Sequence, residues 1–167
     1  MRWNLANEKH AIWIKNKFSF LNPTLVEREN RGWGDISYTV STKSHPCLKT
    51  FYEMVWKDGK KYFNQEVFLK MNEVGWAVLY SDDGHFDKKN KICFIHTESF
   101  SYHENIIISK ILNDFIGYDN GVSVINYKGG QKRNKIYYCL RLKKGASYEF
   151  IKKISKYMAD GMEYKKM

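Results

Sequence analysis

The sequence predicts an α+β fold made of two similar halves, each built from helices and an antiparallel hairpin. Hydrophobic residues make up 43% of the 167 residues and aromatic residues 16%, which is enough apolar surface for a folded core and excludes a disordered chain. Segments with helical spacing alternate with paired strand-like segments, and the order helix, hairpin, helix occurs twice. This repeated order predicts two pseudo-symmetric halves, which we place at residues 1–63 and 64–167.

The first half is expected to begin with a helix that is followed by two strands. Residues 7–21 carry apolar side chains at helical spacing, and residues 23–42 have the composition of two strands around a glycine-containing turn. A second helix is expected from Pro46 to about Trp56, because Ser44 can cap its start and proline is favoured in a first helical turn.

The second half begins with a short helical piece after Asn64, followed by a helix over residues 72–83. Asn72 supplies an N-cap for this helix and Gly84 a C-terminal stop. The remaining expected elements are a strand over 91–100, a helix over 102–117, strands over 122–127 and 134–142, and a helix over 148–158. Their starts are marked by a capping box of Ser101 with Glu104 and by a cap at Ser147.

Charge and cysteine content restrict the partner and the compartment. Lys and Arg total 28 against 18 Asp and Glu, and this net charge of +10 favours a polyanion, either nucleic acid or an anionic membrane surface. No run approaches the ~20 apolar residues of a spanning helix and no signal pattern opens the chain, so nucleic acid is the better partner. Cys47, Cys93 and Cys139 lack disulfide or metal spacing, which predicts reduced, buried thiols in an intracellular protein.

Two acids close the helix over residues 72–83. The carbonyl groups at a helix C-terminus carry partial negative charge, so Asp82 and Asp83 are unfavourable there unless a cation binds. Clustered carboxylate oxygens suit a hard cation such as Mg²⁺. Two solvated acids with a glycine also end many core helices, and composition leaves both interpretations open. The same helix carries small side chains that would let a second helix pack closely against it, namely Gly75, Ala77 and Ser81.

Basic and polar side chains gather around the last hairpin and near the strand over residues 91–100. The candidate nucleic-acid-binding residues are Lys89, Lys91, His96, Lys128, Gln131, Lys132, Arg133, Lys135, Tyr137 and Arg141. Alternation along the strand sends Lys135, Tyr137 and Arg141 to one face. A basic, aromatic ribbon can lie in a DNA major groove, although such clusters are also typical of solvated surface. His96 can equally be a core histidine.

Four segments in order resemble the LAGLIDADG homing endonucleases, in particular the single-chain members encoded in mitochondrial introns. GWAVLYSDDG (residues 75–84) is similar to the second motif of that family, with Ala77 at its small position and Asp83 as the metal-binding acid. The other matching segments, which lie before and after this motif, are residues 42–65, 96–115 and 154–166.

The resemblance implies two αββαββα halves whose antiparallel sheets form a saddle on DNA. It implies a divalent metal, Mg²⁺, that is held by Asp83 with Asp82 beside it. Lys61 and Lys165 match basic residues that the family places near its active sites, and the resemblance therefore implies a catalytic role for both. It also implies an organelle, such as the mitochondrial matrix, or a bacterial or phage cytoplasm.

The first motif helix of the family would precede residues 1–10, so the first half is expected to be truncated. Three functions are then open. The chain can be a DNA endonuclease that is completed by homodimerisation or by a separate fragment carrying the other motif. It can be a cleavage-inactive nucleic-acid binder, such as an RNA maturase or a subunit associated with ribosomes or other RNA–protein particles. It can also be a structural remnant without a ligand.

Overall fold

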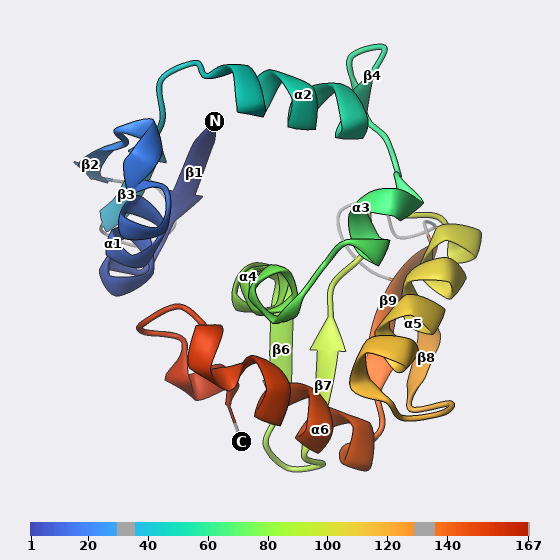
Figure 1. Cartoon of the computed structure of the whole chain (residues 1–167). Helices are drawn as coiled ribbons and strands as arrows, with labels where there is room; N and C mark the ends of the chain where they lie inside the picture. Colours follow the sequence, from blue (N-terminus) through green and yellow to red (C-terminus); the bar gives the residue numbers. More distant parts are fainter. Residues whose placement is uncertain (30–35, 129–135, 167) are drawn as a thin grey trace. The chain divides into compact units, whose positions relative to one another are not determined.

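The computed structural model describes residues 1–29, 36–128 and 136–166, apart from the side chains of Lys60, Lys61 and Lys128. The chain divides into two compact units. Unit 1 comprises Met1–Tyr62 with Ala159–Glu163, and unit 2 comprises Phe63–Met158 with Tyr164–Met167. Both units combine helices with antiparallel strands, which confirms the α+β class (Figure 1).

Unit 1 is built on a three-stranded antiparallel sheet with the strand order β1-β3-β2. Helix α1 begins after Asn7, whose side chain accepts the N–H of His10, and it buries Ala11 and Ile14 beside the sheet residue Val40. The elements are β1 (Arg2–Leu5), α1 (Glu8–Lys17), η1 (Ser19–Leu21), β2 (Thr24–Glu29), β3 (Ile36–Ser41), α2 (Pro46–Val55), β4 (Trp56–Lys57) and β5 (Lys60–Lys61).

Unit 2 is built on a four-stranded antiparallel sheet with the strand order β6-β7-β9-β8. Helix α5 lies in front of β8 and β9 and helix α6 lies in front of β7 (Figure 1). The elements are α3 (Gln65–Leu69), α4 (Glu73–Asp83), β6 (Gly84–Asp87), β7 (Ile92–Ile95), α5 (Tyr102–Ile116), β8 (Val122–Lys128), β9 (Ile136–Leu142), α6 (Lys144–Ile154), η2 (Ser155–Tyr157) and η3 (Glu163–Lys165).

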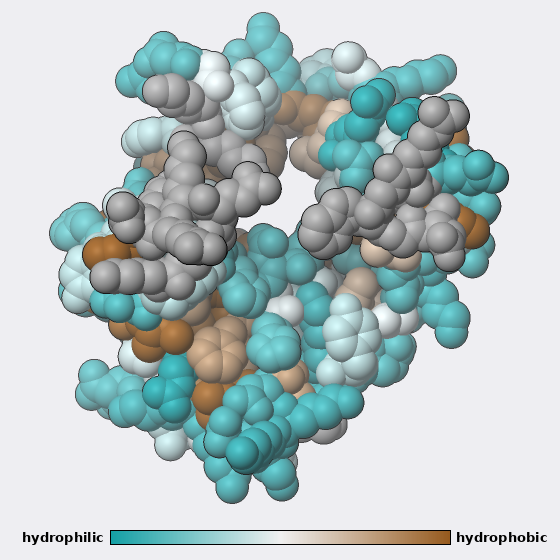
Figure 2. Space-filling view, turned by 180° about the vertical axis from the view of Figure 1, so that it is seen from behind, coloured by the Kyte–Doolittle hydropathy of each residue, from teal (hydrophilic) through white to brown (hydrophobic). Residues whose placement is uncertain are grey.

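The two faces of the unit 2 sheet differ in burial. Cys93, Leu140 and Leu142 point towards the helices and are buried, as expected for side chains under a helical layer. Alternate positions point away from the helices, and we call their side the open face. Cys139 on this side is buried, but His85, Phe94, His96, Tyr137 and Arg141 are at least partly exposed. Viewed from behind, hydrophilic residues make up most of the visible surface and hydrophobic residues form small groups (Figure 2).

Several local predictions are confirmed. Asn72 caps α4 by accepting the N–H groups of Val74 and Gly75. The capping box of Ser101 with Glu104 is complete at the start of α5. Both strands of the last hairpin occur, and β9 is described from Ile136 onwards.

Two predicted caps are wrong. The N-cap of α2 is His45 and not Ser44, since the His45 ring accepts the N–H of Cys47. Helix α6 begins at Lys144, before Ser147. The Ser147 hydroxyl is buried instead, where it accepts the N–H of Cys93 and donates to the Leu142 carbonyl, so it ties α6 to the sheet.

Other expectations also need correction. The strand predicted over residues 91–100 is only β7 (Ile92–Ile95), and a further strand, β6, starts directly at Gly84. Cys93 and Cys139 are buried as expected, but Cys47 is exposed, since it lies in the first turn of α2, a helix that buries none of its residues. None of the helices in the described ranges has the length and apolar character that crossing a bilayer requires.

Candidate functional site

The two acids predicted to bind metal stand at the C-terminal end of α4. The helix buries one side against the core of unit 2 through Trp76, Ala77 and Tyr80, so its last turn is held in place. The Asp83 carbonyl accepts the N–H of His96 at 2.8 Å, which extends the pairing of β6 with β7 by one residue. The acidic end of α4 is therefore joined directly to the edge of the open face at His96.

Lys165 lies beneath this acidic end and is only 8% exposed. Its Nζ donates to the carbonyl oxygens of Ser81 at 2.6 Å and Asp82 at 3.2 Å. Its own carbonyl accepts the Tyr80 hydroxyl at 3.1 Å. A cation bonded to the last carbonyls of a helix offsets the negative end of the helix dipole. The sequence-predicted pair of Lys165 with the acids is thus brought together by the fold.

Two neighbouring carboxylates, of Asp82 and Asp83, raise each other's electrostatic energy in this cluster. Asp82 is accessible to solvent, yet the protein atoms around its carboxyl group and the neighbouring Asp83 carboxylate raise its pKa to about 6, against the opposing effect of Lys165. Burial lowers the pKa of Lys165, while Asp82 and Asp83 act in the opposite direction. A second positive charge beside the carboxylates would relieve the repulsion between them.

These residues fit a divalent cation. Mg²⁺ is commonly bound through one or two carboxylates, with water and substrate phosphate oxygens completing its coordination. Asp82 and Asp83 supply such oxygens, and burial together with the neighbouring Asp83 carboxylate raises the pKa of Asp82. Within the described part of the chain, no group of three or more His, Cys, Asp or Glu side chains forms a cage made of protein ligands alone.

A second polar cluster lies on the open face around Glu98. His96 Nδ1 is 2.7 Å from Glu98 Oε1, and the Tyr127 hydroxyl donates to the same oxygen. Tyr127 stacks on Tyr137 with ring centroids 5.9 Å apart. Partial burial would raise the pKa of Glu98, but hydrogen bonds from Tyr127, the backbone and His96 outweigh this effect and lower it. His96 is therefore an exposed, oriented side chain and not a core histidine.

The sequence missed Glu98 and Tyr127 as members of this cluster. Alternation could have indicated Tyr127, which pairs directly with Tyr137, but not Glu98, which lies beyond the end of β7. The contact between Glu98 and Tyr127 joins positions 29 residues apart, and a pattern along the chain does not specify such a contact.

The other predicted binding residues divide between the open face and other places. Arg141 pairs with Phe94 and Ser123 on the open face. Lys89 and Lys91 belong to the turn between β6 and β7 and not to the open face. Lys128 pairs with Ile136 through its backbone, and its side chain lies outside the described atoms. Four predicted residues lie outside the described part of the chain: Gln131, Lys132, Arg133 and Lys135.

Lys61, the other predicted catalytic lysine, belongs to unit 1 and its backbone pairs with Trp56 in the short β4–β5 hairpin. Its side chain is also outside the described atoms. The cluster that the structure describes therefore consists of Asp82, Asp83 and Lys165, with His96 next to it.

The sequence is similar to those of known DNA endonucleases. Residues 1–154 match the profile of the LAGLIDADG DNA endonuclease family. A probable intron-encoded DNA endonuclease 3 of Mycosarcoma maydis is 30% identical over 91 residues, which are 52% of this chain and 67% of that protein.

Solved structures show the same fold. The homing endonuclease I-WcaI, bound to its DNA recognition sequence, matches with a TM-score of 0.80 and 22% identity over 99% of this chain and 74% of that chain. Mesophilic variants of the homing endonuclease I-DmoI match with a TM-score of 0.55 and 17% identity over 93% of this chain and 79% of that chain. The profile match covers most of the chain, and the protein belongs to the LAGLIDADG DNA endonuclease family.

Proposed function

We propose that this protein binds DNA on the open face and cleaves a phosphodiester bond next to the acidic end of α4. The observation that carries the proposal is the placement of Asp82 and Asp83 at a helix end that Lys165 holds from below. Membership of a DNA endonuclease family supplies the substrate class.

Asp83, with Asp82 beside it, would hold the divalent cation, for which Mg²⁺ is the expected ion. A bound Mg²⁺ supplies Lewis-acid stabilisation of the charge that develops on phosphate oxygens. Lys165 keeps the last turn of α4 in place and adds a fixed positive charge beside the phosphate position. Lys61 is proposed as a second basic group on the strength of the family motif.

The open face would position the DNA. Arg141 can bond to phosphates or to guanine edges, and Tyr137 and the oriented His96 add contacts to bases or sugars. The hairpin residues Lys128, Gln131, Lys132, Arg133 and Lys135, together with Lys89 and Lys91 of the β6–β7 turn, are proposed to add phosphate contacts.

Cleavage of both DNA strands needs a second acidic helix end in addition to that of α4. We propose that a second copy of this chain, or a separate fragment that carries the first motif, supplies it. An organelle is the proposed location, since the fungal relative is described as intron-encoded.

The experiment measures cleavage of DNA duplexes that have first been selected for binding to the protein. Cleavage is expected with Mg²⁺, to stop with a chelator, and to fall at least about 100-fold in Asp83→Asn, because a charged metal ligand is lost. Asp119→Asn removes the charge of an exposed aspartate elsewhere and is expected to cleave normally. Undiminished cutting by Asp83→Asn contradicts the proposed role of Asp83.

The alternative function is nucleic-acid binding without cleavage, for example as an RNA maturase or a subunit of an RNA–protein particle. The observation that favours it is that α4 is the only motif helix in the described ranges. Tight binding of structured RNA together with no cleavage of any selected duplex, at every Mg²⁺ concentration tried, would support this alternative over the nuclease.

A further inference from the structure

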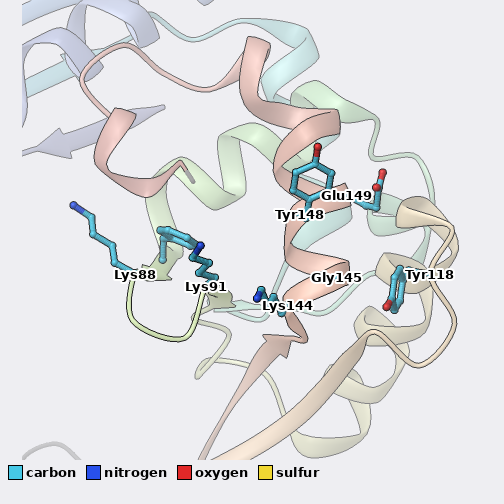
Figure 3. A pocket seen from close by; sticks show the side chains of 8 residues that line it. Lys88, Lys91, Tyr118, Lys144, Gly145, Tyr148 and Glu149 are labelled. Carbon is cyan, nitrogen blue, oxygen red and sulfur yellow. The ribbon is translucent and has the colours of Figure 1, made fainter.

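A cavity of about 680 Å³ lies in unit 2, away from the acidic site. Its walls come from the β6–β7 turn, from the first turns of α6 and from Tyr118, which follows α5 (Figure 3). Aromatic side chains form the apolar part, namely Phe86, Tyr118 and Tyr148. Small-molecule sites commonly have volumes of about 300–1,000 Å³ and mostly apolar walls with a few polar groups.

The cavity and the open face are on opposite sides of the sheet. His85 and Phe86 are neighbours in β6, so their side chains point to opposite faces. His85 belongs to the open face, whereas Phe86 is 9% exposed and lines the cavity on the helical side. A ligand in this cavity is therefore separate from a duplex bound to the open face.

The wall at Tyr118 is fixed by close packing against two glycines. A Cβ atom at Gly145 would come within 2.5 Å of the Tyr118 hydroxyl oxygen, and one at Gly121 within 2.7 Å of the Tyr118 ring. The Gly121 carbonyl accepts the N–H of Lys143 at 2.8 Å, and Asn113 Oδ1 accepts the N–H of Val122 at 3.0 Å. The sequence thus holds the Tyr118 ring against the start of α6, although the tyrosine is still 40% exposed.

The turn between β6 and β7 is also preorganised, and it carries two lysines of the cavity. Asp87 Oδ1 accepts the N–H groups of Lys89 at 2.9 Å and Asn90 at 3.1 Å. The Asp87 carbonyl accepts the N–H of Lys91 at 2.8 Å. These bonds fix the backbone that presents Lys88 and Lys91.

The charge around the cavity favours an anion. Lys88, Lys91 and Lys144 line it, against one acid, Glu149. Glu149 Oε2 is 3.7 Å from Lys152 Nζ, so the lysine partly neutralises the negative charge of Glu149. Figure 3 shows the lysines on the turn and at the start of α6, with Tyr148 and Glu149 further along the helix.

We propose that this cavity binds a nucleoside phosphate, with the base against Tyr118 and Tyr148 and the phosphate near Lys91 and Lys144. Aromatic side chains stack on any base, and lysine ammonium groups are common phosphate ligands. The nucleotide can be free in solution or can be the end of a single strand. This proposal does not rest on the nuclease activity, because the cavity does not contain the acidic site.

The test uses the intact protein labelled with ¹⁵N and titrated with adenosine 5′-monophosphate, followed by amide NMR shifts. We expect the largest shifts at Lys91, Lys144 and Gly145. Adenosine and ribose 5-phosphate, which each lack one half of the ligand, are expected to bind at least about tenfold more weakly, because they lose either the phosphate contacts or the stacking. A 5′-phosphorylated single-stranded tetranucleotide distinguishes the two sources.

Two variants with matched controls test the assignment. Tyr148→Ala removes a 57% exposed ring and is expected to weaken binding at least about fivefold, the lower limit for loss of one stacked base. Tyr102→Ala removes a 55% exposed ring outside the cavity and should leave binding unchanged. Lys144→Gln is expected to weaken binding, and Lys110→Gln, which removes an exposed charge on α5, is not.

The outcomes separate clearly. Shifts at the cavity amides with AMP and not with the tetranucleotide assign a free nucleotide, and shifts there with the tetranucleotide assign the end of a single strand. Binding of neither probe, or equal weakening by the control variants, contradicts the proposal. Asp83→Asn should bind AMP as the wild type does, so failure of the nuclease proposal would leave this result untouched.

Discussion

At the scale of single residues, Lys165 has a structural role that its position in the sequence does not reveal. It is a nearly buried lysine whose amine bonds to two main-chain carbonyls at the end of α4. Removal of the hydrogen-bond donor of a buried carbonyl group destabilises the folded protein, because the carbonyl then has neither that donor nor water as a partner. Lys165 therefore supports the acidic site as well as adding charge to it.

Lys165→Met should lower the free energy of unfolding by about 1–3 kcal/mol, because the Ser81 and Asp82 carbonyls lose their donor. Urea denaturation measures the change. Lys110→Met, which removes an exposed lysine from α5, is the control and should alter stability by less than about 0.5 kcal/mol. Equal stability of Lys165→Met and wild type would show that the amine is not needed as a cap.

Glu98 is expected to make stability depend on acid pH. Its pKa in the folded protein is below the ordinary value of 4.5, so its stabilising effect is present above pH 4.5 and is lost as the pH falls through the folded pKa. The wild type should therefore lose its advantage over Glu98→Gln in strong acid. Urea midpoints of both proteins at neutral and at acid pH measure this.

Glu53→Gln is the control for the Glu98 comparison. Glu53 is 62% exposed and lies 3.9 Å from Lys49, an arrangement that contributes little to stability. Its difference from the wild type should change little with pH. A constant difference between wild type and Glu98→Gln at all pH values would contradict the lowered pKa of Glu98.

At the scale of elements, the junction of α4 with β6 decides where the acids stand. Gly84 ends the helix and begins the strand without any loop, and its φ of −86° is accessible to every residue. Glycine is needed there for space, since a Cβ atom would lie 2.2 Å from the Tyr80 ring and 2.3 Å from the Tyr80 carbonyl oxygen. The buried Tyr80 ring occupies the place of that side chain.

Gly84→Ala should destabilise the protein by about 1–3 kcal/mol or more, because the methyl group overpacks against Tyr80. Gly75→Ala is the matched control in the same helix. Its Cβ would meet the flexible Met71 side chain at 3.3 Å, and replacement of a helical glycine by alanine is expected to stabilise by up to about 1 kcal/mol. Thermal or urea unfolding compares the two, and the same sign for both would contradict the steric role of Gly84.

At the scale of the whole molecule, the net charge of +10 should dominate affinity for nucleic acid. Phosphate contacts release counterions, so the logarithm of the association constant is expected to fall linearly with the logarithm of the salt concentration. Arg141→Gln should weaken binding and reduce this slope by about 1, because one phosphate contact is lost. Fluorescence anisotropy with labelled duplexes measures both.

Lys110→Gln has the same change of net charge on α5, away from the open face, and is the control for Arg141→Gln. A reduction of the slope by the control as large as that by Arg141→Gln would show that total charge, and not the open face, determines binding. Affinity that does not change with salt would contradict the electrostatic basis altogether.

Much of the fold could be predicted where local chemistry decides the structure. The Asn72 cap, the Ser101–Glu104 capping box and the alternation that places Tyr137 with Arg141 all depend on neighbours within a few residues. The start of α6 was predicted wrongly because Ser147 is of a residue type that is favoured at helix N-caps. Its hydroxyl is used instead by Cys93, 54 residues away.

The sequence by itself determined the α+β class, the motif helix that ends in two acids, and the charge that calls for a polyanion. Each of these depends on composition or on spacing within one element. Only the tertiary structure decided that Lys165 caps that helix from 84 residues away and that Glu98 joins His96 to Tyr127. The reason is physical: hydrogen bonds are specific only at about 3 Å, and the folded core alone brings such distant groups to that distance.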